Sequence, residues 1–401
     1  MTKSLSLAKL TFLIAILTSV GQMTQTMYVP SIASMAKELL VEPSALQAVM
    51  AFFLIPYGFS QLIYGPVSDR IGRKPIIVAG LVIYILGTLL SLFSREYSWF
   101  LIGSFIQGLG IGCGGVMCRT LPRDCFSGPD LHRVNSLISM CVIFSPLIAP
   151  LLGGYLSDTF GWRSSYLFLT IFSIGVVLAM MTNMIETLPV ERRKPESVYT
   201  SYKTVLSEKR FQGYLICLVA TFSGVAVFEA ASGVLFGGVL HYSATAVSLL
   251  FVVPIPGYLI GASICSKIAQ RFGNNAALYV GLGAIIAGAL VILIPGIMGE
   301  TNAPTLVSGA VLYFFGGGIL YPAATTGAIS PFPRHAGTAG AMLGGMQNLG
   351  AGLVALIASL LPADNQMPVG AIMLAMALLA AFGIWRSTGD ADSPSDEPAL
   401  A

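Results

Sequence analysis

Charged side chains are scarce in this sequence. Of its 401 residues only 10% are Asp, Glu, Lys or Arg, whereas 55% are hydrophobic. A soluble globular domain carries about 25% charged residues, and 39 charged side chains could not cover two or three such domains. The same apolarity excludes intrinsic disorder. The composition therefore predicts a protein whose solvent is the lipid bilayer.

Residue patterns of metal sites, disulfide frameworks and nucleotide-driven enzymes are also missing. The six cysteines lie mostly in apolar runs, without the paired spacing of a zinc site or a disulfide framework. The loop Gly-x-x-x-x-Gly-Lys-Ser/Thr of ATP-driven proteins does not occur, and the three histidines form no catalytic cluster. A net charge of +3 is too small to indicate a nucleic-acid partner. We therefore expect neither an enzyme nor a protein with a bound cofactor.

Long apolar runs are abundant. A transmembrane helix needs about 20 predominantly apolar residues, and clusters of polar residues, Pro and Gly separate twelve runs of this kind. The predicted spans are residues 10–28, 44–64, 75–94, 99–118, 134–156, 165–185, 211–236, 243–266, 276–296, 305–327, 338–360 and 368–386. The sequence thus predicts an all-α membrane protein with twelve transmembrane helices.

The positions of Lys and Arg predict the orientation, because these residues concentrate on the cytoplasmic side. With twelve spans both termini lie on one side, which collects 18 of the 21 basic residues. The opposite side holds Lys37, Arg95 and Arg163. Lys3 and Lys9 precede the first run, but no small-x-small cleavage site follows where a secretory signal would have one. We expect cytoplasmic termini and an uncleaved first helix.

A basic connection in the middle of the chain indicates two halves. We expect an N-terminal six-helix bundle, a cytoplasmic linker, a C-terminal six-helix bundle and an acidic cytoplasmic tail, at residues 1–185, 186–210, 211–387 and 388–401. A weak repeat supports the division, because Arg70-Ile-Gly72 returns 201 residues later as Arg271-Phe-Gly273. Duplicated halves are typical of transporters whose substrate site lies between the halves, near the middle of the membrane.

The connection after the second span carries the most specific local signal. It reads Gly65-Pro-Val-Ser-Asp69-Arg70-Ile-Gly72-Arg73-Lys74. Gly65 is expected to turn the chain tightly, and the basic side chains are placed where anionic headgroups attract them. Asp69 needs a specific partner, either a neighbouring Arg or the positive end of a helix. The alternative interpretation is that this connection is a basic turn whose only role is to set the membrane topology.

The fifth span predicts close helix packing. It contains Ser145-Pro-Leu-Ile-Ala149-Pro150-Leu-Leu-Gly153-Gly154. Small residues four apart lie on one helix face and permit close approach of another helix. Pro146 and Pro150 each remove a backbone donor and can bend the helix. The pattern indicates either a helix shaped for a moving interface or ordinary packing between membrane helices.

One acidic residue lies inside an apolar span. Of 18 Asp and Glu residues, 17 fall in connections, span ends or the tail, and the exception is Glu229. An ionised carboxylate at this depth costs about 2.5–3.5 kcal/mol on insertion scales, and removal from water favours its protonated form. No Lys, Arg or His occurs in the middle of a span as a fixed partner. Glu229 is predicted either to bind a proton or a cationic substrate, or to be a hydrogen-bonded structural residue.

The connection after the second span resembles the loop signature of the major facilitator superfamily, Gly-x-x-x-Asp-Arg-x-Gly-Arg-Lys. More narrowly, the runs at 21–28, 119–124 and 228–235 resemble the proton-coupled multidrug antiporters with twelve spans. The fifth span is similar to their motif Gly-x-x-x-Gly-Pro-x-x-Gly-Gly, with Ser145 and Ala149 at its first two glycines. The resemblance covers essentially the whole chain apart from the acidic tail at 390–397.

This resemblance implies two pseudo-symmetric six-helix bundles around a substrate cavity. It implies that Asp69 and its Arg neighbours latch the two halves together on the cytoplasmic side. The residues assigned to gating and conformational change are Gly65, Asp69, Arg70, Arg73, Arg119, Pro150, Gly153 and Gly154. Arg119 is alternatively an anchor at the membrane interface.

The chain departs from the family pattern at two positions. The Arg that relatives often carry three residues before Gln107-Gly108 is Ser104, and the acid that many carry in the first span is absent from Thr26-Met27-Tyr28. Proton coupling is therefore expected at Glu229. The 201-residue offset places Glu229 opposite Tyr28, in symmetry-related helices.

Aromatic and amide residues in the cavity-lining spans of this family predict an apolar cavity suited to lipophilic compounds. The candidate substrate-binding residues are Gln22, Gln25, Tyr28, Tyr57, Gln61, Phe222, Phe251, Phe314 and Gln347. A wider set adds Tyr258, Tyr313, Phe315, Tyr321 and Asn348. Each of these side chains is also compatible with ordinary packing.

The sequence thus predicts a monomeric secondary transporter of the bacterial inner membrane. It would export lipophilic, often cationic, compounds in exchange for protons, with the proton gradient as its energy source. The alternative is a passive uniporter or a metabolite carrier that is not coupled to protons. A sensory membrane protein is disfavoured because the central linker, about 25 residues long, leaves no room for an output domain.

Overall fold

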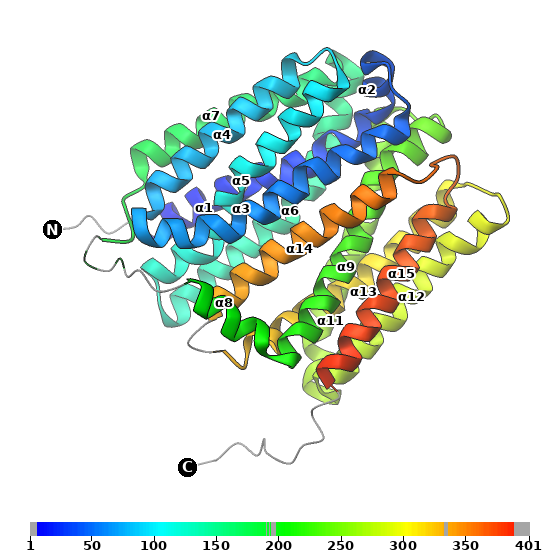
Figure 1. Cartoon of the computed structure of the whole chain (residues 1–401). Helices are drawn as coiled ribbons and strands as arrows, with labels where there is room; N and C mark the ends of the chain where they lie inside the picture. The colour runs from blue at the N-terminus through cyan, green and yellow to red at the C-terminus, as the bar shows by residue number, and fades with distance from the viewer. Residues whose placement is uncertain (1–5, 190, 192, 194–197, 333–335, 389–401) are drawn as a thin grey trace.

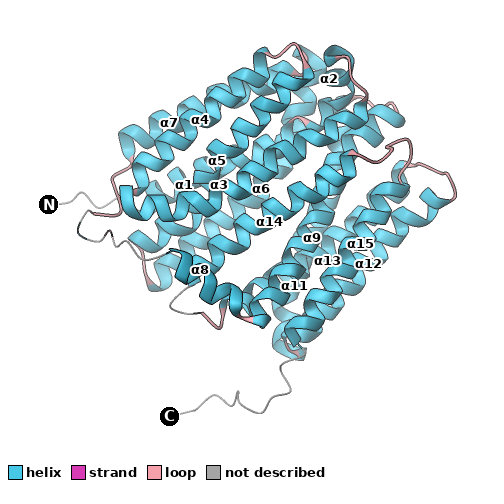
Figure 2. Ribbon diagram, viewed as in Figure 1, coloured by secondary structure: helices cyan, strands magenta, loops and turns pink. Residues whose placement is uncertain are grey.

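The computed structural model describes residues 6–189, 191, 193, 198–332 and 336–388. All regular elements within these ranges are helices (Figure 2). Twelve helical segments are long and apolar enough to cross a membrane, which confirms the predicted spans. They cover Leu7–Leu39, Pro43–Ile71, Arg73–Phe93, Tyr97–Cys125, Gly128–Phe160, Arg163–Asn183, Lys209–Val239, Ala244–Phe272, Asn274–Ile297, Ala303–Ile329, Thr338–Ser359 and Met367–Thr388.

Eight spans are single helices. These are α4 (Arg73–Phe93), α5 (Tyr97–Cys125), α6 (Gly128–Phe160), α7 (Arg163–Asn183), α12 (Asn274–Ile297), α13 (Ala303–Ile329), α14 (Ala336–Ser359) and α15 (Met367–Thr388). The other four are the first and second spans of each half, and each consists of two or more segments. The first half has α1 (Leu7–Met27), a 3-10 turn at Val29–Ser31, α2 (Ile32–Leu39), a 3-10 turn at Pro43–Gln47 and α3 (Ala48–Ile71). The second half has α9 (Lys209–Ser232), a π-helical segment at Gly233–Val239, α10 (Ala244–Val252) and α11 (Pro254–Phe272).

Proline marks the start of three segments. Pro30 and Pro254 each lie in the first turn of a segment inside a span, and Pro43 opens the second span. Proline is tolerated there because the first amides of a helix have no partner within it. The interruption in the seventh span is the π-helical segment Gly233–Val239.

The two halves repeat the same packing. In the first half α4 packs against α5 and α7, α3 against α5, and α1 against α6. In the second half α12 packs against α13 and α15, α11 against α13, and α9 against α14. The halves meet through α3 and α14, which lie side by side in Figure 1, and through α6 and α10. Two pseudo-symmetric six-helix bundles are therefore confirmed.

α1 begins and α15 ends on the same side of the bundle, which we call the terminal side (Figure 1). The opposite side is called the far side. The predicted linker contains a helix of its own, α8 (Val198–Ser207), which packs on α14 at the terminal side. Beyond Thr388 the predicted acidic tail lies outside the described residues, and the division at residues 185 and 210 stays a prediction.

The predicted turn at Gly65 is wrong. α3 continues through Gly65 to Ile71, because a backbone that leaves its helix inside a membrane loses hydrogen bonds that water does not replace. The turn lies instead at Gly72, whose φ of 115° is one that glycine adopts without a Cβ clash. Gly273, with a φ of 86°, makes the equivalent turn between α11 and α12. The repeat at an offset of 201 residues is therefore structural.

An apolar cluster built from both halves closes the far side. Two larger clusters fill the interiors of the two halves. The far-side cluster joins Tyr28, Ile32 and Trp162 of the first half to Val234 and Phe251 of the second. Because these side chains are buried against each other, the two halves are in contact on the far side.

Candidate functional site

Glu229 meets the opposite half of the molecule. It lies in α9, with 7% of its surface exposed, and its Oε2 accepts a hydrogen bond of 2.8 Å from Nε2 of Gln25 in α1. Gln25 is buried as well. The ion pairs of the described residues all involve other carboxylates. Glu229 therefore has an amide partner from the other half and no fixed cationic partner within this part of the chain.

Tyr28 lies close to this pair. Its hydroxyl is near enough to Glu229 for an electrostatic interaction, as the 201-residue offset predicts. The hydroxyl is buried and makes no hydrogen bond within the described residues. One turn beyond Glu229, α9 passes into the π-helical segment, whose Gly233 touches the Val29 carbonyl so closely that a Cβ would clash. π-helical segments are frequent at functional sites.

The other predicted binding residues of the first half lie in its core. Tyr57 and Gln61 of α3 are buried beside Gly115. Phe222, from α9 of the second half, packs against the core cluster of the first half that contains Tyr57, and so links the halves. Gln22 is half-buried in α1.

The predicted binding residues Phe314, Gln347 and Phe251 of the second half lie in three different places. Phe314 meets Phe228, the residue before Glu229, edge to face at 5.9 Å between ring centroids. Gln347 accepts a hydrogen bond of 2.9 Å from the hydroxyl of Tyr321. Phe251 belongs to the far-side cluster. The structure thus brings Gln25 and Tyr28 to Glu229, packs Phe314 on the preceding Phe228, and places Phe251 in the closed far side.

The wider set of aromatic and amide residues lies in the second half. Tyr258, Tyr313 and Phe315 pack in its core, and Asn348 is buried in α14. The Tyr313 hydroxyl, like that of Tyr28, makes no hydrogen bond in the described part of the chain.

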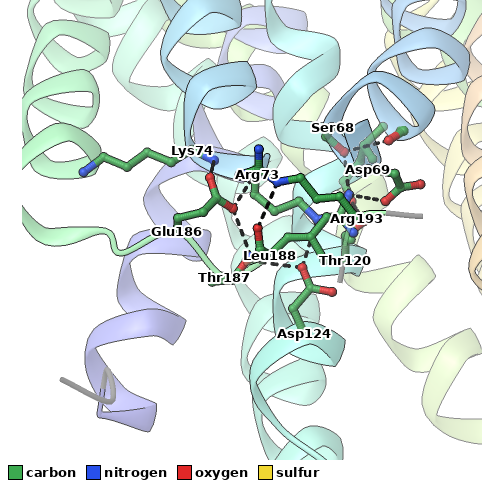
Figure 3. Close-up of polar contacts among 12 residues, drawn as sticks. Ser68, Asp69, Arg73, Lys74, Thr120, Asp124, Glu186, Thr187, Leu188 and Arg193 are labelled. Carbon is green, nitrogen blue, oxygen red and sulfur yellow. Dashed lines mark hydrogen bonds and ion pairs between the residues drawn. The ribbon is translucent and has the colours of Figure 1, made fainter. Parts of the chain in front are cut away.

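The loop at the terminal end of α3 is organised around Arg73, the first residue of α4 (Figure 3). The Arg73 side chain is 6% exposed and pairs with Asp69 at 2.6 Å and with Asp124 at 2.9 Å. It also donates to Oγ of Ser68 at 2.6 Å. The partner that Asp69 requires is therefore a neighbouring Arg, one of the two predicted alternatives.

α4 and α7 cap each other beside this cluster (Figure 3). The Glu186 carboxylate, just after α7, accepts from the backbone amides of Arg73 at 2.8 Å and Lys74 at 3.1 Å. In return Nζ of Lys74 donates to the carbonyls of Met181 and Met184, at 2.7 Å each. A negative group at a helix N-terminus and a positive group at a C-terminus both stabilise the helix ends.

Arg119, rather than Asp69, bridges the halves at the terminal side. Its guanidinium donates to the carbonyl of Gly340 in α14. Asp69 pairs within its own half. Partial burial, with a smaller contribution from the Asp69 carboxylate, raises the pKa of Tyr202 in α8. Tyr202 in turn donates to the Leu62 carbonyl of α3 at 3.2 Å. Arg70 is exposed in the last turn of α3.

The predicted motif of the fifth span forms tight contacts at the far side. A Cβ at Gly153 would clash with the Met27 carbonyl of α1, and one at Gly154 would lie 2.7 Å from the Ala244 carbonyl oxygen. Pro150 is buried inside the uninterrupted α6. The contact between α6 and α10 continues at Asp158, whose Oδ2 accepts from N and Oγ1 of Thr245 at 2.8 and 2.6 Å. These small residues thus lie where α6 meets both α1 and the second half.

Three site residues escaped the sequence reasoning. Glu186 and Asp158 stand at span ends, where acidic residues are common, and Asp124 is the last residue of the run 119–124. The one local signal for Glu186 is that it directly follows an apolar run. Among the described residues no group of His, Cys, Asp and Glu could hold a metal ion.

Comparisons with known proteins agree with this architecture. The Major Facilitator Superfamily profile matches residues 14–355. The chain is 43% identical to Multidrug resistance protein D of Escherichia coli K12 over 92% of this chain and 93% of that protein. It is 26% identical to the Chloramphenicol resistance protein of Pseudomonas aeruginosa, over 93% and 89% of the two chains. A structure of the Escherichia coli xylose transporter XylE superposes with a TM-score of 0.70 at 14% identity, over 95% and 97% of the chains, which shows a shared fold.

The profile match and the identity to Multidrug resistance protein D confirm the resemblance inferred from the loop motifs. The expectation that the chain is not an enzyme is confirmed with them, because the matched proteins are transporters. The chain, with its twelve spans and paired six-helix bundles, belongs to the major facilitator superfamily of membrane transporters.

Proposed function

We propose that this chain is a drug-efflux transporter that exports lipophilic, often cationic, compounds in exchange for protons. The observation that carries the proposal is the position of Glu229, buried between the halves with a single amide donor. A buried carboxylate without a cationic partner becomes neutral by binding a proton, or is paired by a cationic ligand. One group can therefore hold a proton or a substrate, and the two compete for it.

The family relatives support the drug-efflux part of this proposal. Multidrug resistance protein D and the Chloramphenicol resistance protein match nearly the whole chain. The apolar run around Glu229 in α9, and the edge-to-face contact of the preceding Phe228 with Phe314, favour lipophilic ligands.

Alternating access follows from the way the halves meet. The terminal side, which carries most of the Lys and Arg residues, faces the cytoplasm by the positive-inside rule. The far side is closed by the mixed apolar cluster and by the Asp158 contact with Thr245. On the terminal side Arg119 contacts Gly340 across the halves, and when this contact opens, substrate reaches Glu229 from the cytoplasm. Opening of the far side then lets a proton from outside bind Glu229 and displace the substrate.

The mechanism needs no bound cofactor, because the proton gradient supplies the energy. It requires one chain, and we expect a monomer in the bacterial inner membrane. Its partners are then the bilayer, protons and small lipophilic molecules.

Transport in liposomes tests the proposal. The purified protein is reconstituted, a pH gradient is imposed, and uphill movement of a lipophilic cationic dye is measured for wild type, Glu229→Gln and the exposed control Glu300→Gln. Wild type and Glu300→Gln are expected to concentrate the dye, and Glu229→Gln is expected to lose gradient-driven transport. Dye counterflow that ignores the pH gradient in the wild type would support the passive uniporter instead.

A further inference from the structure

A groove on the outer surface of the first half plays no part in the transport site described above. It has a volume of 1090 Å³ and lies at the far side between the end of α4, the end of α6 and the start of α7. Its size is that of a large small-molecule pocket, since such pockets measure about 300–1,000 Å³. It faces outward from the bundle, away from the interface between the halves.

The groove is polar at one end, at Glu38, Arg95 and Arg163. Two of these groups already have partners. The Glu38 carboxylate accepts from Nε1 of Trp162 at 2.6 Å and pairs with Arg163. Arg163 also donates to the carbonyls of Leu92 at 3.1 Å and Ser94 at 2.8 Å. The charges of Glu38 and Arg163 therefore compensate each other.

Arg95 is different. It is exposed in the short connection between α4 and α5, and the described residues offer it no hydrogen bond or ion pair. The far side has only three basic residues, Lys37, Arg95 and Arg163, and two of them line this groove. The charges of the residues that line the groove, Glu38, Arg95 and Arg163, therefore sum to +1, and the exposed Glu96 that follows Arg95 in the chain does not line it.

The rest of the groove is apolar and runs into the membrane. Phe160 is 71% exposed and Ile171 is 63% exposed. Arg163 opens α7, so Ile171 lies about 12 Å deeper at 1.5 Å per residue. A positive group at the span ends and an apolar wall below it match an amphiphile with an anionic head and a hydrocarbon tail.

We propose that this groove binds an anionic phospholipid, with the phosphate at Arg95 and one acyl chain along Leu167 and Ile171. A zwitterionic headgroup carries its own cation, which compensates the phosphate and weakens the attraction to Arg95. An anionic headgroup has no cation of its own, so its negative phosphate interacts with the Arg95 guanidinium. The binding does not depend on the proposed transport activity, because no groove residue contacts Glu229 or Gln25.

Photocrosslinking from liposomes locates the lipid. The full-length protein is reconstituted with trace phosphatidylglycerol or phosphatidylcholine that carry the same diazirine acyl chain, and labelled peptides are quantified by mass spectrometry. Label on residues 156–171 is expected to be about fivefold higher with phosphatidylglycerol, the factor for one cation near an anionic headgroup. Label on α12, remote in sequence and in the other half, serves as the internal reference.

Two charge-matched variants sharpen the experiment. Arg95→Gln and Lys37→Gln each remove one far-side positive charge, and only Arg95 lines the groove. Arg95→Gln is expected to lower the phosphatidylglycerol label on 156–171 to the phosphatidylcholine level, whereas Arg95→Lys and Lys37→Gln keep most of it. The proposal is overturned if the two lipids label this segment equally in the wild type, if the preference survives in Arg95→Gln, or if Lys37→Gln abolishes it as well.

Discussion

Nε2 of Gln25 and Oε2 of Glu229 lie 2.8 Å apart, although 204 positions separate the two residues in the chain. Each belongs to the first span of its half, and both are buried. In the alternating access that we propose, one half moves against the other, so a bond between the halves at this depth depends on their relative position. The Gln25 amide also gives the buried Glu229 carboxylate one hydrogen-bond donor, and a bound proton or cationic substrate can add a second interaction.

Gln25→Leu is expected to impair efflux. The variant removes the one recorded side-chain donor to Glu229 at nearly unchanged volume, and a hydrogen bond to a charged group is worth about 1.5–3 kcal/mol. We expect the initial rate of dye efflux from cells to fall about tenfold or more. Gln270→Leu, an exposed glutamine at the end of α11, is the control. Equal rates in Gln25→Leu and wild type, at equal protein levels, would contradict the role of the pair.

Arg73→Ala is expected to destabilise the first half. The variant leaves Asp124, whose side chain is 16% exposed, without its cation. Breaking a buried ion pair from one side costs about 3–5 kcal/mol, and we expect a value near the low end because Asp69 is 53% exposed. Thermal unfolding in detergent should show a clear decrease in Tm for Arg73→Ala and almost none for the exposed Arg70→Ala. If both variants unfold at the wild-type temperature, the cluster in Figure 3 contributes little to stability.

Asp158→Ala is expected to favour opening of the far side. It removes two hydrogen bonds from α6 to Thr245 of the other half, each worth about 0.5–1.5 kcal/mol. Spin labels at the far ends of α6 and α10 should show a larger population with a long distance, increased about fivefold. Asp364→Ala, an exposed carboxylate on the same side, is the matched control. An unchanged distance distribution in Asp158→Ala would show that the contact does not hold the far side closed.

Gly153→Ala is expected to disturb the packing of α6 on α1. The added Cβ meets the Met27 carbonyl, a backbone atom that cannot rotate away, and overpacking costs about 1–3 kcal/mol. Gly175→Ala places its Cβ where nothing lies within 4 Å, so it is a matched control. We expect reduced Tm and reduced efflux for Gly153→Ala alone. A Gly153→Ala protein as stable and active as Gly175→Ala would mean that α6 moves aside at no cost.

The sequence could predict what depends on local patterns. Twelve spans follow from apolar runs of membrane length, and Glu229 stands out because it interrupts one of them. The pairing of Asp69 with an Arg was also predictable, since Arg73 is four residues away on the chain. The offset of 201 residues correctly relates the glycine turns at Gly72 and Gly273.

Contacts between distant segments could not be predicted in the same way. The pairs Glu186 with Lys74 and Asp158 with Thr245 join residues 112 and 87 positions apart. An acidic residue at a span end gives no signal for which distant helix it will cap. The turn predicted at Gly65 was wrong because glycine tolerates a turn without requiring one, and the membrane favours the unbroken helix. Arg119 bridges the halves through a backbone carbonyl, which every residue offers.

Proton release on substrate binding tests the central claim most directly. Purified protein in weakly buffered detergent solution is mixed with a lipophilic cation that cells expressing the protein export, and the pH change is followed with an indicator dye. The account predicts that wild-type protein releases protons as the cation binds, and that Glu229→Gln releases none and binds the cation more weakly. Equal proton release from Glu229→Gln and wild type, or none from a wild-type protein that binds the cation, would contradict competition at Glu229.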